Sequence, residues 1–128
     1  MERKDVTLLH ASFLFGQLIS IYLVRYVMEA FMQKESGYQQ KLIKKLKDMF
    51  PGCIVLKNDA GYIQGFPDLT ILYKDHWATL ECKRDSKSSH RPNQEYYVQK
   101  TNEMSFSRFI FPENEEEVLR DLQQAFGL

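Results

Sequence analysis

The sequence predicts an α/β domain with a mixed β-sheet flanked by helices and preceded by an apolar N-terminal helix. Segments with helical periodicity alternate with short runs rich in β-branched and aromatic residues, in the order helix, three strands, helix, strand, helix. The 128 residues, of which 44% are hydrophobic and 27% charged, suffice for one globular domain with a single core. We assign this domain to residues 34–128 and treat residues 1–33 as a separate segment.

The N-terminal segment contains a long apolar run. Residues 6–24 include no Asp, Glu, Lys or Arg, and Arg25 ends the run. Such a run satisfies the length requirement for a membrane-spanning helix, about 18 residues or more. Three interpretations stay open: a membrane anchor, a helix that packs on the domain or on a second copy, or upstream sequence attached through a mis-assigned start. The third is preferred, with Met28 or Met32 as the true start, and membrane contact through residues 6–24 is not favoured.

The first helix of the domain is amphipathic. Its apolar residues form one stripe along the helix, and its lysines lie mainly outside this stripe. This placement favours lysines that face solvent over lysines that contact DNA. Ser36 and Gln39 have the spacing of a capping box, so we expect the helix to begin near Ser36, and Pro51-Gly52 ends it. The stripe comprises Tyr38, Leu42, Ile43, Leu46, Met49 and Phe50, and the lysines are Lys41, Lys44, Lys45 and Lys47.

A short strand and a glycine-containing loop follow the helix. Residues 53–57 form a continuous apolar run, which predicts a strand at the centre of the sheet. In the loop of residues 58–65, Gly61 and Gly65 permit a close approach of the backbone to a neighbour. This loop leads directly into the next strand.

Two alternating segments predict a β-hairpin. Residues 68–73 and 77–83 each alternate with period two and are joined through Lys74-Asp75. If the turn is symmetric, residues whose numbers have the same sum face each other. Asp68 is then directly opposite Glu81.

Two opposed carboxylates predict a cation site. Their Cβ atoms are about 4.5–5.5 Å apart, and carboxylates this close repel each other unless a proton or a cation neutralises them. Mg²⁺ is suited to such a site because it prefers oxygen ligands and keeps several waters. Lys83 shares the face of Glu81, where its ammonium can stabilise charge on a phosphate or orient a water. The alternative is an ordinary surface hairpin in which Asp68 and Glu81 are solvated and Lys83 pairs with one of them.

The C-terminal part completes the predicted fold. Residues 84–91 are polar and form a loop, Pro92 suits the first position of a helix, and Gln94 falls in its first turn. A strand is expected at residues 106–111, followed by a helix whose first turn is acidic.

These residues resemble a known family. Pro67-Asp68 followed by Glu81-Cys82-Lys83 is similar to the PD-(D/E)xK signature of metal-dependent nucleases. The wider set resembles the VRR-NUC nucleases, which include small stand-alone phage-type proteins, over residues 35–122. That set consists of Gly65-Phe66-Pro67-Asp68, Glu81-x-Lys83 and Arg91-Pro92-x-Gln94.

The resemblance implies a restriction-endonuclease-like core and a set of site residues. Asp68 and Glu81 would hold Mg²⁺ or Mn²⁺, with the main-chain carbonyl of Cys82 as a third ligand. Lys83 would be catalytic, and Gln94 would border the active site. Related nucleases often carry an acidic residue on the first helix near the position of Gln39, which leaves Glu35 or Gln39 as an additional metal ligand.

The expected function is a Mg²⁺-dependent endonuclease that hydrolyses DNA, with selectivity for branched or junction DNA as a plausible specialisation. Residues 34–100 carry 12 Lys/Arg and 8 Asp/Glu, whereas residues 101–128 carry 2 and 6, so the middle of the chain is modestly basic and the tail acidic. A solvated helix face accounts for part of this excess. A homodimer is expected, and no small-molecule cofactor. The predicted nucleic-acid contacts are Lys57, Asn58, Gly65, Arg84, Lys87 and Arg91.

Two other functions stay open, a domain that binds nucleic acid without cutting it and a membrane-anchored interaction protein. The two cysteines form no CxxC motif, which favours a reducing compartment. With the phage-type resemblance, this predicts the cytoplasm of a bacterium or of a phage-infected host.

Overall fold

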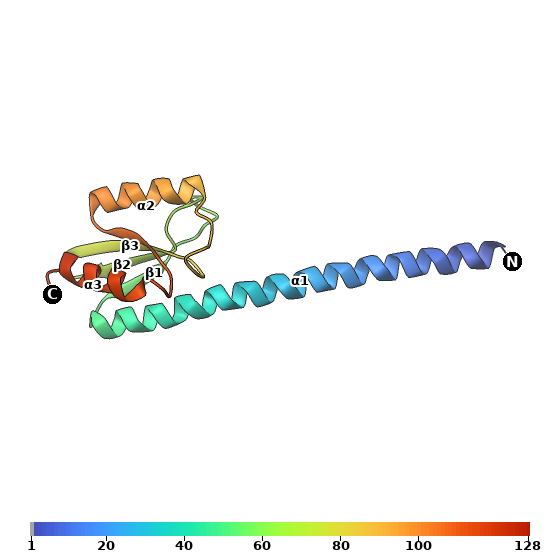
Figure 1. Cartoon of the computed structure of the whole chain (residues 1–128), viewed down its shortest axis with the longest axis horizontal. Helices are drawn as coiled ribbons and strands as arrows, with labels where there is room; N and C mark the ends of the chain where they lie inside the picture. The colour runs from blue at the N-terminus through green and yellow to red at the C-terminus, as the bar shows by residue number, and fades with distance from the viewer. Residues whose placement is uncertain (1) are drawn as a thin grey trace. The chain divides into compact units, whose positions relative to one another are not determined.

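The computed structural model describes the backbone of residues 2–128 and the side chains of residues 11–28 and 37–128. The chain forms two compact units, residues 1–34 and 35–128. The elements, shown in Figure 1, are α1 (Glu2–Met49), β1 (Ile54–Lys57), β2 (Leu69–Tyr73), β3 (His76–Cys82), α2 (Pro92–Met104), β4 (Ser107–Ile110) and α3 (Glu115–Ala125). The predicted order of helices and strands is confirmed.

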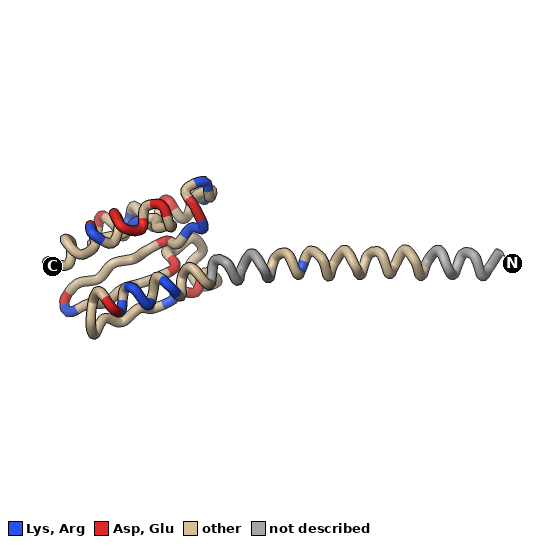
Figure 2. Tube along the Cα trace, turned by 60° about the horizontal axis from the view of Figure 1, so that its bottom comes forward, with Lys and Arg blue, Asp and Glu red and all other residues tan. Residues whose placement is uncertain are grey.

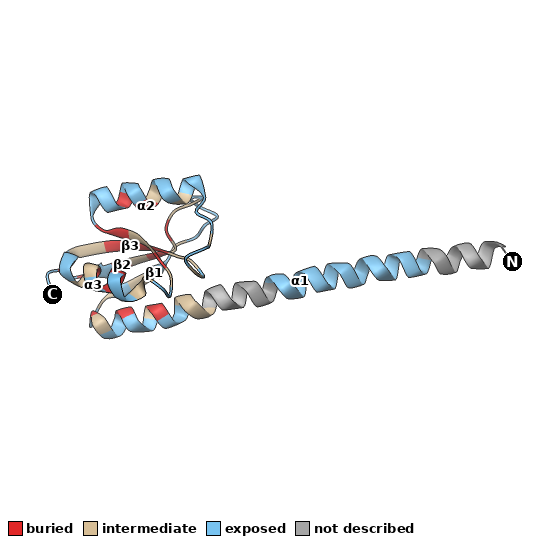
Figure 3. Cartoon of the chain, viewed as in Figure 1, coloured by how far each residue is buried: buried red, intermediate tan, exposed pale blue. Residues whose placement is uncertain are grey.

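The first unit consists of the N-terminal part of α1. Among residues 11–28, Arg25 is the one Lys, Arg, Asp or Glu (Figure 2), and every side chain is exposed (Figure 3). By length and composition alone, residues 11–28 could cross a membrane.

The second unit contains a four-stranded mixed sheet in the order β1-β2-β3-β4. The pairs β1–β2 and β2–β3 are antiparallel, whereas β3 and β4 are parallel. The parallel pairing follows from α2, which connects β3 to β4 as a crossover. An α/β unit with a mixed sheet and flanking helices is therefore confirmed.

The two faces of this sheet are covered differently (Figure 1). One face packs on the last turns of α1 and on α3, and it holds the apolar core. On the other face α2 lies over β3 and β4, where the hydroxyl of Thr79 shares hydrogen bonds with those of Thr101 (2.9 Å) and Ser107 (2.8 Å). The fully buried core side chains include Leu42, Leu46, Phe50, Leu69, Ile71, Leu80, Ile110 and Leu122.

Two predictions about the first elements are wrong. The strand predicted for the centre of the sheet, β1, lies at an edge, and its Ile54 and Leu56 remain 56% and 46% exposed. Its apolar residues are covered on one face only, because α2 does not extend over β1. The helix predicted to begin near Ser36 begins earlier, since α1 runs through that residue. The predicted apolar stripe is confirmed, with Leu42 and Leu46 fully buried.

Candidate metal-dependent active site

The register of the β2–β3 hairpin brings the two acidic residues together. The strands pair from Leu69 with Leu80 to Tyr73 with His76, around the predicted two-residue turn. The predicted symmetric hairpin is thus confirmed, and the same register carried one residue further places Asp68 opposite Glu81. The main-chain N–H of Cys82 donates to Asp68 Oδ2 at 2.9 Å, which holds this carboxylate at the end of β3.

Glu81 is the most constrained acidic residue of the site. Its side chain is 3% exposed, Oε1 accepts a hydrogen bond from Gln94 Nε2 at 3.0 Å, and Oε2 is buried without a hydrogen-bond partner among the described residues. Burial raises the pKa of Glu81 to about 8, the nearby Asp68 carboxylate adds to the rise, and the Lys83 ammonium partly opposes it. The site therefore favours a proton or a cation beside Glu81.

Gln94 connects the lysine to this carboxylate. Its Oε1 accepts from Lys83 Nζ at 2.6 Å and from the main-chain N–H of Arg91 at 3.2 Å, while its Nε2 donates to Glu81. Pro92 begins α2, so Gln94 lies in the first turn, next to the sheet. The amide thus fixes the Lys83 ammonium beside the carboxylate pair.

Asn58 has a role that the sequence did not indicate. Its Nδ2 donates to the carbonyl of Pro67 and to Thr70 Oγ1, each at 2.8 Å, and its main-chain N–H donates to the Asp68 carbonyl at 2.8 Å. These three bonds hold the backbone at Pro67 and Asp68 and the side chain of Thr70. Asn58, predicted to contact nucleic acid, is therefore a positioning residue for the first carboxylate.

Gly65 joins the preceding loop to α2. Its φ is +87°, and a Cβ atom at this position would lie 2.4 Å from Asn93 Cβ and 2.8 Å from the Asn93 carbonyl carbon. Only glycine permits this approach. Gly65 thus contacts the first turn of the helix that carries Gln94, and its contact with nucleic acid stays a prediction.

The other predicted residues occupy different surroundings. Four basic residues predicted to bind nucleic acid are exposed, and the candidate additional ligand Gln39 is half-buried on α1 and takes no part in the bonds described above. The side chain of Glu35 lies outside the described residues. The exposed basic residues are Lys57, Arg84, Lys87 and Arg91.

The residues present suit a small cation with few protein ligands. No group of three or more His, Cys, Asp or Glu side chains that could hold a metal ion occurs in the described part of the chain. Asp68 and Glu81 supply two carboxylates, so a third protein ligand would be a main-chain oxygen, such as the Cys82 carbonyl. The unpartnered Oε2 of Glu81 is a free ligand position, and Mg²⁺ accepts such a set because water fills its remaining positions.

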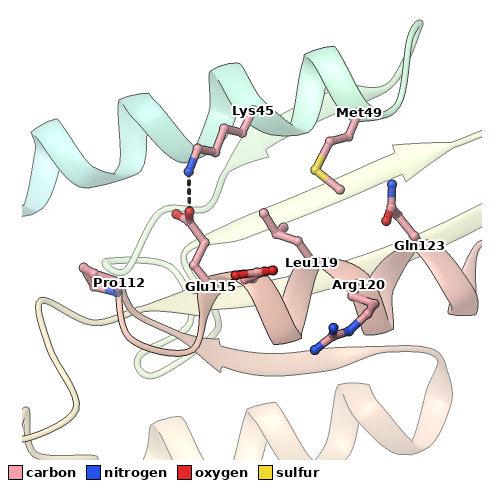
Figure 4. Close-up of a pocket in the computed structure, with 8 residues that line it drawn as sticks. Lys45, Met49, Pro112, Glu115, Leu119, Arg120 and Gln123 are labelled. Carbon is pink, nitrogen blue, oxygen red and sulfur yellow. Dashed lines mark hydrogen bonds and ion pairs between the residues drawn. The ribbon is translucent and has the colours of Figure 1, made fainter.

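A cavity of about 590 Å³ lies elsewhere, between α1 and α3 (Figure 4). Lys45 and Glu115 form an ion pair there, and Glu115 also accepts a hydrogen bond from the Tyr38 hydroxyl at 3.1 Å. None of the described residues that line this cavity is a predicted site residue. The cavity lies on the side of the sheet away from α2, so we do not assign it to the carboxylate site.

Comparisons of the chain with protein-family models, with curated proteins and with solved structures give no match. The resemblance to the VRR-NUC nucleases therefore rests on the motif residues themselves.

Proposed function

We propose that residues 35–128 form a Mg²⁺- or Mn²⁺-dependent endonuclease of the VRR-NUC type, with a restriction-endonuclease-like core, that hydrolyses DNA phosphodiester bonds. The observation that carries the proposal is Glu81, a carboxylate that is 3% exposed, lies opposite Asp68 and has an unpartnered oxygen. Burying a second negative charge beside the first is unfavourable unless a cation accompanies it. A hydrolytic metal site explains why the two acids are kept together.

The proposed mechanism assigns one task to each residue. A bound Mg²⁺ or Mn²⁺ would draw charge from the scissile phosphate and lower the pKa of a bound water. Asp68 and Glu81 supply the negative charge that holds the cation. Lys83 places its ammonium where it stabilises negative charge on the phosphate or orients the attacking water. Gln94 holds Lys83 through the 2.6 Å bond and so reduces the reorganisation needed before reaction.

Exposed basic residues support nucleic acid as the substrate. Arg84 follows β3 closely and Arg91 directly precedes α2, so both lie at the ends of elements that carry site residues, and Lys57 ends β1 directly before the positioning residue Asn58. Phosphate contacts from such residues give affinity that falls with salt. Two copies in a symmetric dimer would present two sites to the two strands of a branched DNA, which makes junction DNA a substrate to test.

The proposal is tested by cleavage of plasmid, linear duplex, single-stranded and four-way-junction DNA by the full-length protein in non-ionic detergent. Reactions contain Mg²⁺, Mn²⁺ or EDTA. The variants are Asp68→Asn, Glu81→Gln and Lys83→Met, and Lys100→Met serves as the matched control because Lys100 is an exposed lysine on α2 away from the site.

We expect metal-dependent cleavage that both carboxylate variants abolish and that Lys100→Met retains. Lys83→Met should retain the stabilisation of the fold by Mg²⁺ but lose turnover by about 10²-fold or more, because its ammonium acts on the reacting groups rather than on the cation. Cleavage by Lys83→Met at the wild-type rate would remove the lysine from the mechanism. Well-folded protein that cuts none of the four substrates would contradict the proposed activity.

A further inference from the structure

The first unit exposes a continuous run of mostly apolar side chains. Every described residue from 11 to 28 is exposed (Figure 3). The exposed fractions of Phe13, Ile21 and Tyr22 are 63%, 63% and 70%. Contiguous apolar patches larger than a few hundred Å² mark contacts with another molecule or with a membrane. We therefore expect this surface to contact another molecule or a membrane.

The distribution of the apolar residues around the helix indicates which environment surrounds it. Residues 21–24 are four consecutive apolar residues, and at about 100° per residue they point in all directions around the axis. A helix that lies on a membrane surface has one apolar face, and a two-helix coiled coil has a narrow apolar seam. In residues 11–20, Ser12, Gly16, Gln17 and Ser20 lie on one side of the helix, but this side carries no charge, unlike the strongly charged face of a surface-bound helix. A wide apolar surface with an uncharged polar stripe fits a helix surrounded by lipid better than either arrangement.

Length and end residues agree with a bilayer. At about 1.5 Å per residue, the 18-residue span is about 27 Å long, close to the roughly 30 Å hydrocarbon core. Arg25, the one charged residue of the span, lies near its end, where its side chain can reach the headgroups. Tyr22 and Tyr26 lie at the same end, as aromatic residues do at membrane interfaces.

We propose that residues 11–28 span a lipid bilayer and that residues 35–128 remain on its cytoplasmic side. Basic residues accumulate on the cytoplasmic side of membrane proteins. The N-terminal flank carries Arg3 and Lys4, whereas the flank after the span carries the larger set Lys34, Lys41, Lys44, Lys45 and Lys47. The inference is independent of nuclease activity, since it concerns only the first unit and the charges beside it.

The test is synthesis of the full-length chain in the presence of inverted bacterial inner-membrane vesicles, whose cytoplasmic face is outward. Vesicles are floated on a density gradient, extracted with alkaline carbonate and treated with proteinase K. We expect the chain to float, to resist carbonate, and to lose residues 35–128 to the protease while a small fragment with residues 11–28 stays protected.

Two arginine variants make the test specific. Leu18→Arg places a charge near the centre of the span and should lower the ratio of inserted to free protein about 100-fold. Val27→Arg adds the same charge beside Arg25 and should change this ratio by less than about 5-fold, because the side chain reaches the interface. Equal flotation of Leu18→Arg and wild type would overturn the proposal. The proposal would also be overturned if carbonate released the chain, if the chain pelleted without floating, or if it formed a soluble oligomer without vesicles. Full protection of residues 35–128 from proteinase K would overturn their placement on the cytoplasmic side.

Discussion

Replacement of Glu81 by glutamine should stabilise the metal-free protein at neutral and alkaline pH while it abolishes cleavage. Glutamine has the shape of the protonated glutamate and keeps an oxygen that accepts from Gln94. It carries no charge at any pH. The substitution therefore removes the repulsion with Asp68 and the burial of a charge, with little change in packing.

The magnitude follows from the pKa of the side chain. The ordinary value of 4.5 applies to the unfolded chain and the value of about 8 to the folded one, so the folded state binds the proton more tightly. Proton binding by Glu81 therefore adds to the free energy of unfolding. This contribution is complete below pH 4.5 and is lost as the pH rises to about 8. The lost contribution is roughly 1 kcal/mol at pH 5, roughly 3 at pH 7 and roughly 5 at pH 9.

Urea unfolding with EDTA, at pH 5, 7 and 9, measures this difference. Trp77 is the single tryptophan and lies in β3, so its fluorescence reports the unfolding of the sheet in the full-length protein in non-ionic detergent. Glu81→Gln should exceed the wild type in unfolding free energy by about 3 kcal/mol at pH 7. The control Glu95→Gln removes an exposed acid from α2 and should change the unfolding free energy by less than about 0.5 kcal/mol.

Equal unfolding free energies of Glu81→Gln and wild type at pH 9 would refute the reasoning. Glu81 would then ionise in the folded state without penalty. The carboxylate pair would need no cation, and the main support for the proposed function would be lost.

Three further predictions concern the same site. Mg²⁺ should bind more tightly as the pH rises from 6 to 8, because the cation displaces the proton of Glu81. Calorimetry in buffers of different ionisation enthalpy measures the released proton. A Mg²⁺ affinity that does not change with pH would contradict this prediction. Asn58→Ala should lower cleavage 10- to 100-fold at saturating Mg²⁺, as expected when an outer-shell bond is lost, and wild-type rates would exclude the positioning role. Gly65→Ala should destabilise the domain by about 2 kcal/mol or more and Gly52→Ala by about 1, since both have φ +87° but only Gly65 meets Asn93; equal losses in urea unfolding would show that the contact is unimportant.

The hairpin was predictable because its information is local. The two-residue turn and the alternation of its arms determine which residues face each other, and the observed pairing of Leu69 with Leu80 follows that rule. The edge position of β1 was not predictable, because an apolar run does not reveal whether one face or both are covered. That depends on where α2 lies, which is a property of the tertiary structure.

The site was predicted in part. Asp68, Glu81 and Lys83 are separated by fixed strand spacing, so their proximity can be read from the sequence. The bond from Gln94 to Glu81 joins two elements, and only the family resemblance indicated it. The three bonds of Asn58 within the domain could not be predicted, because they depend on how the loop folds back.

The parallel pairing of β4 with β3 also determines the order in which the site forms. The hairpin that carries Asp68 and Glu81 is a local structure, and hairpins form within microseconds. The β3–β4 pairing requires the α2 crossover and is slower, because non-local contacts must first close a long loop. Burial is the main cause of the raised pKa of Glu81, so below about pH 8 we expect proton uptake to accompany the step in which α2 covers this side chain. Refolding of the metal-free chain should therefore be faster at pH 5 than at pH 9, and the site's own charge sets the rate of its closure.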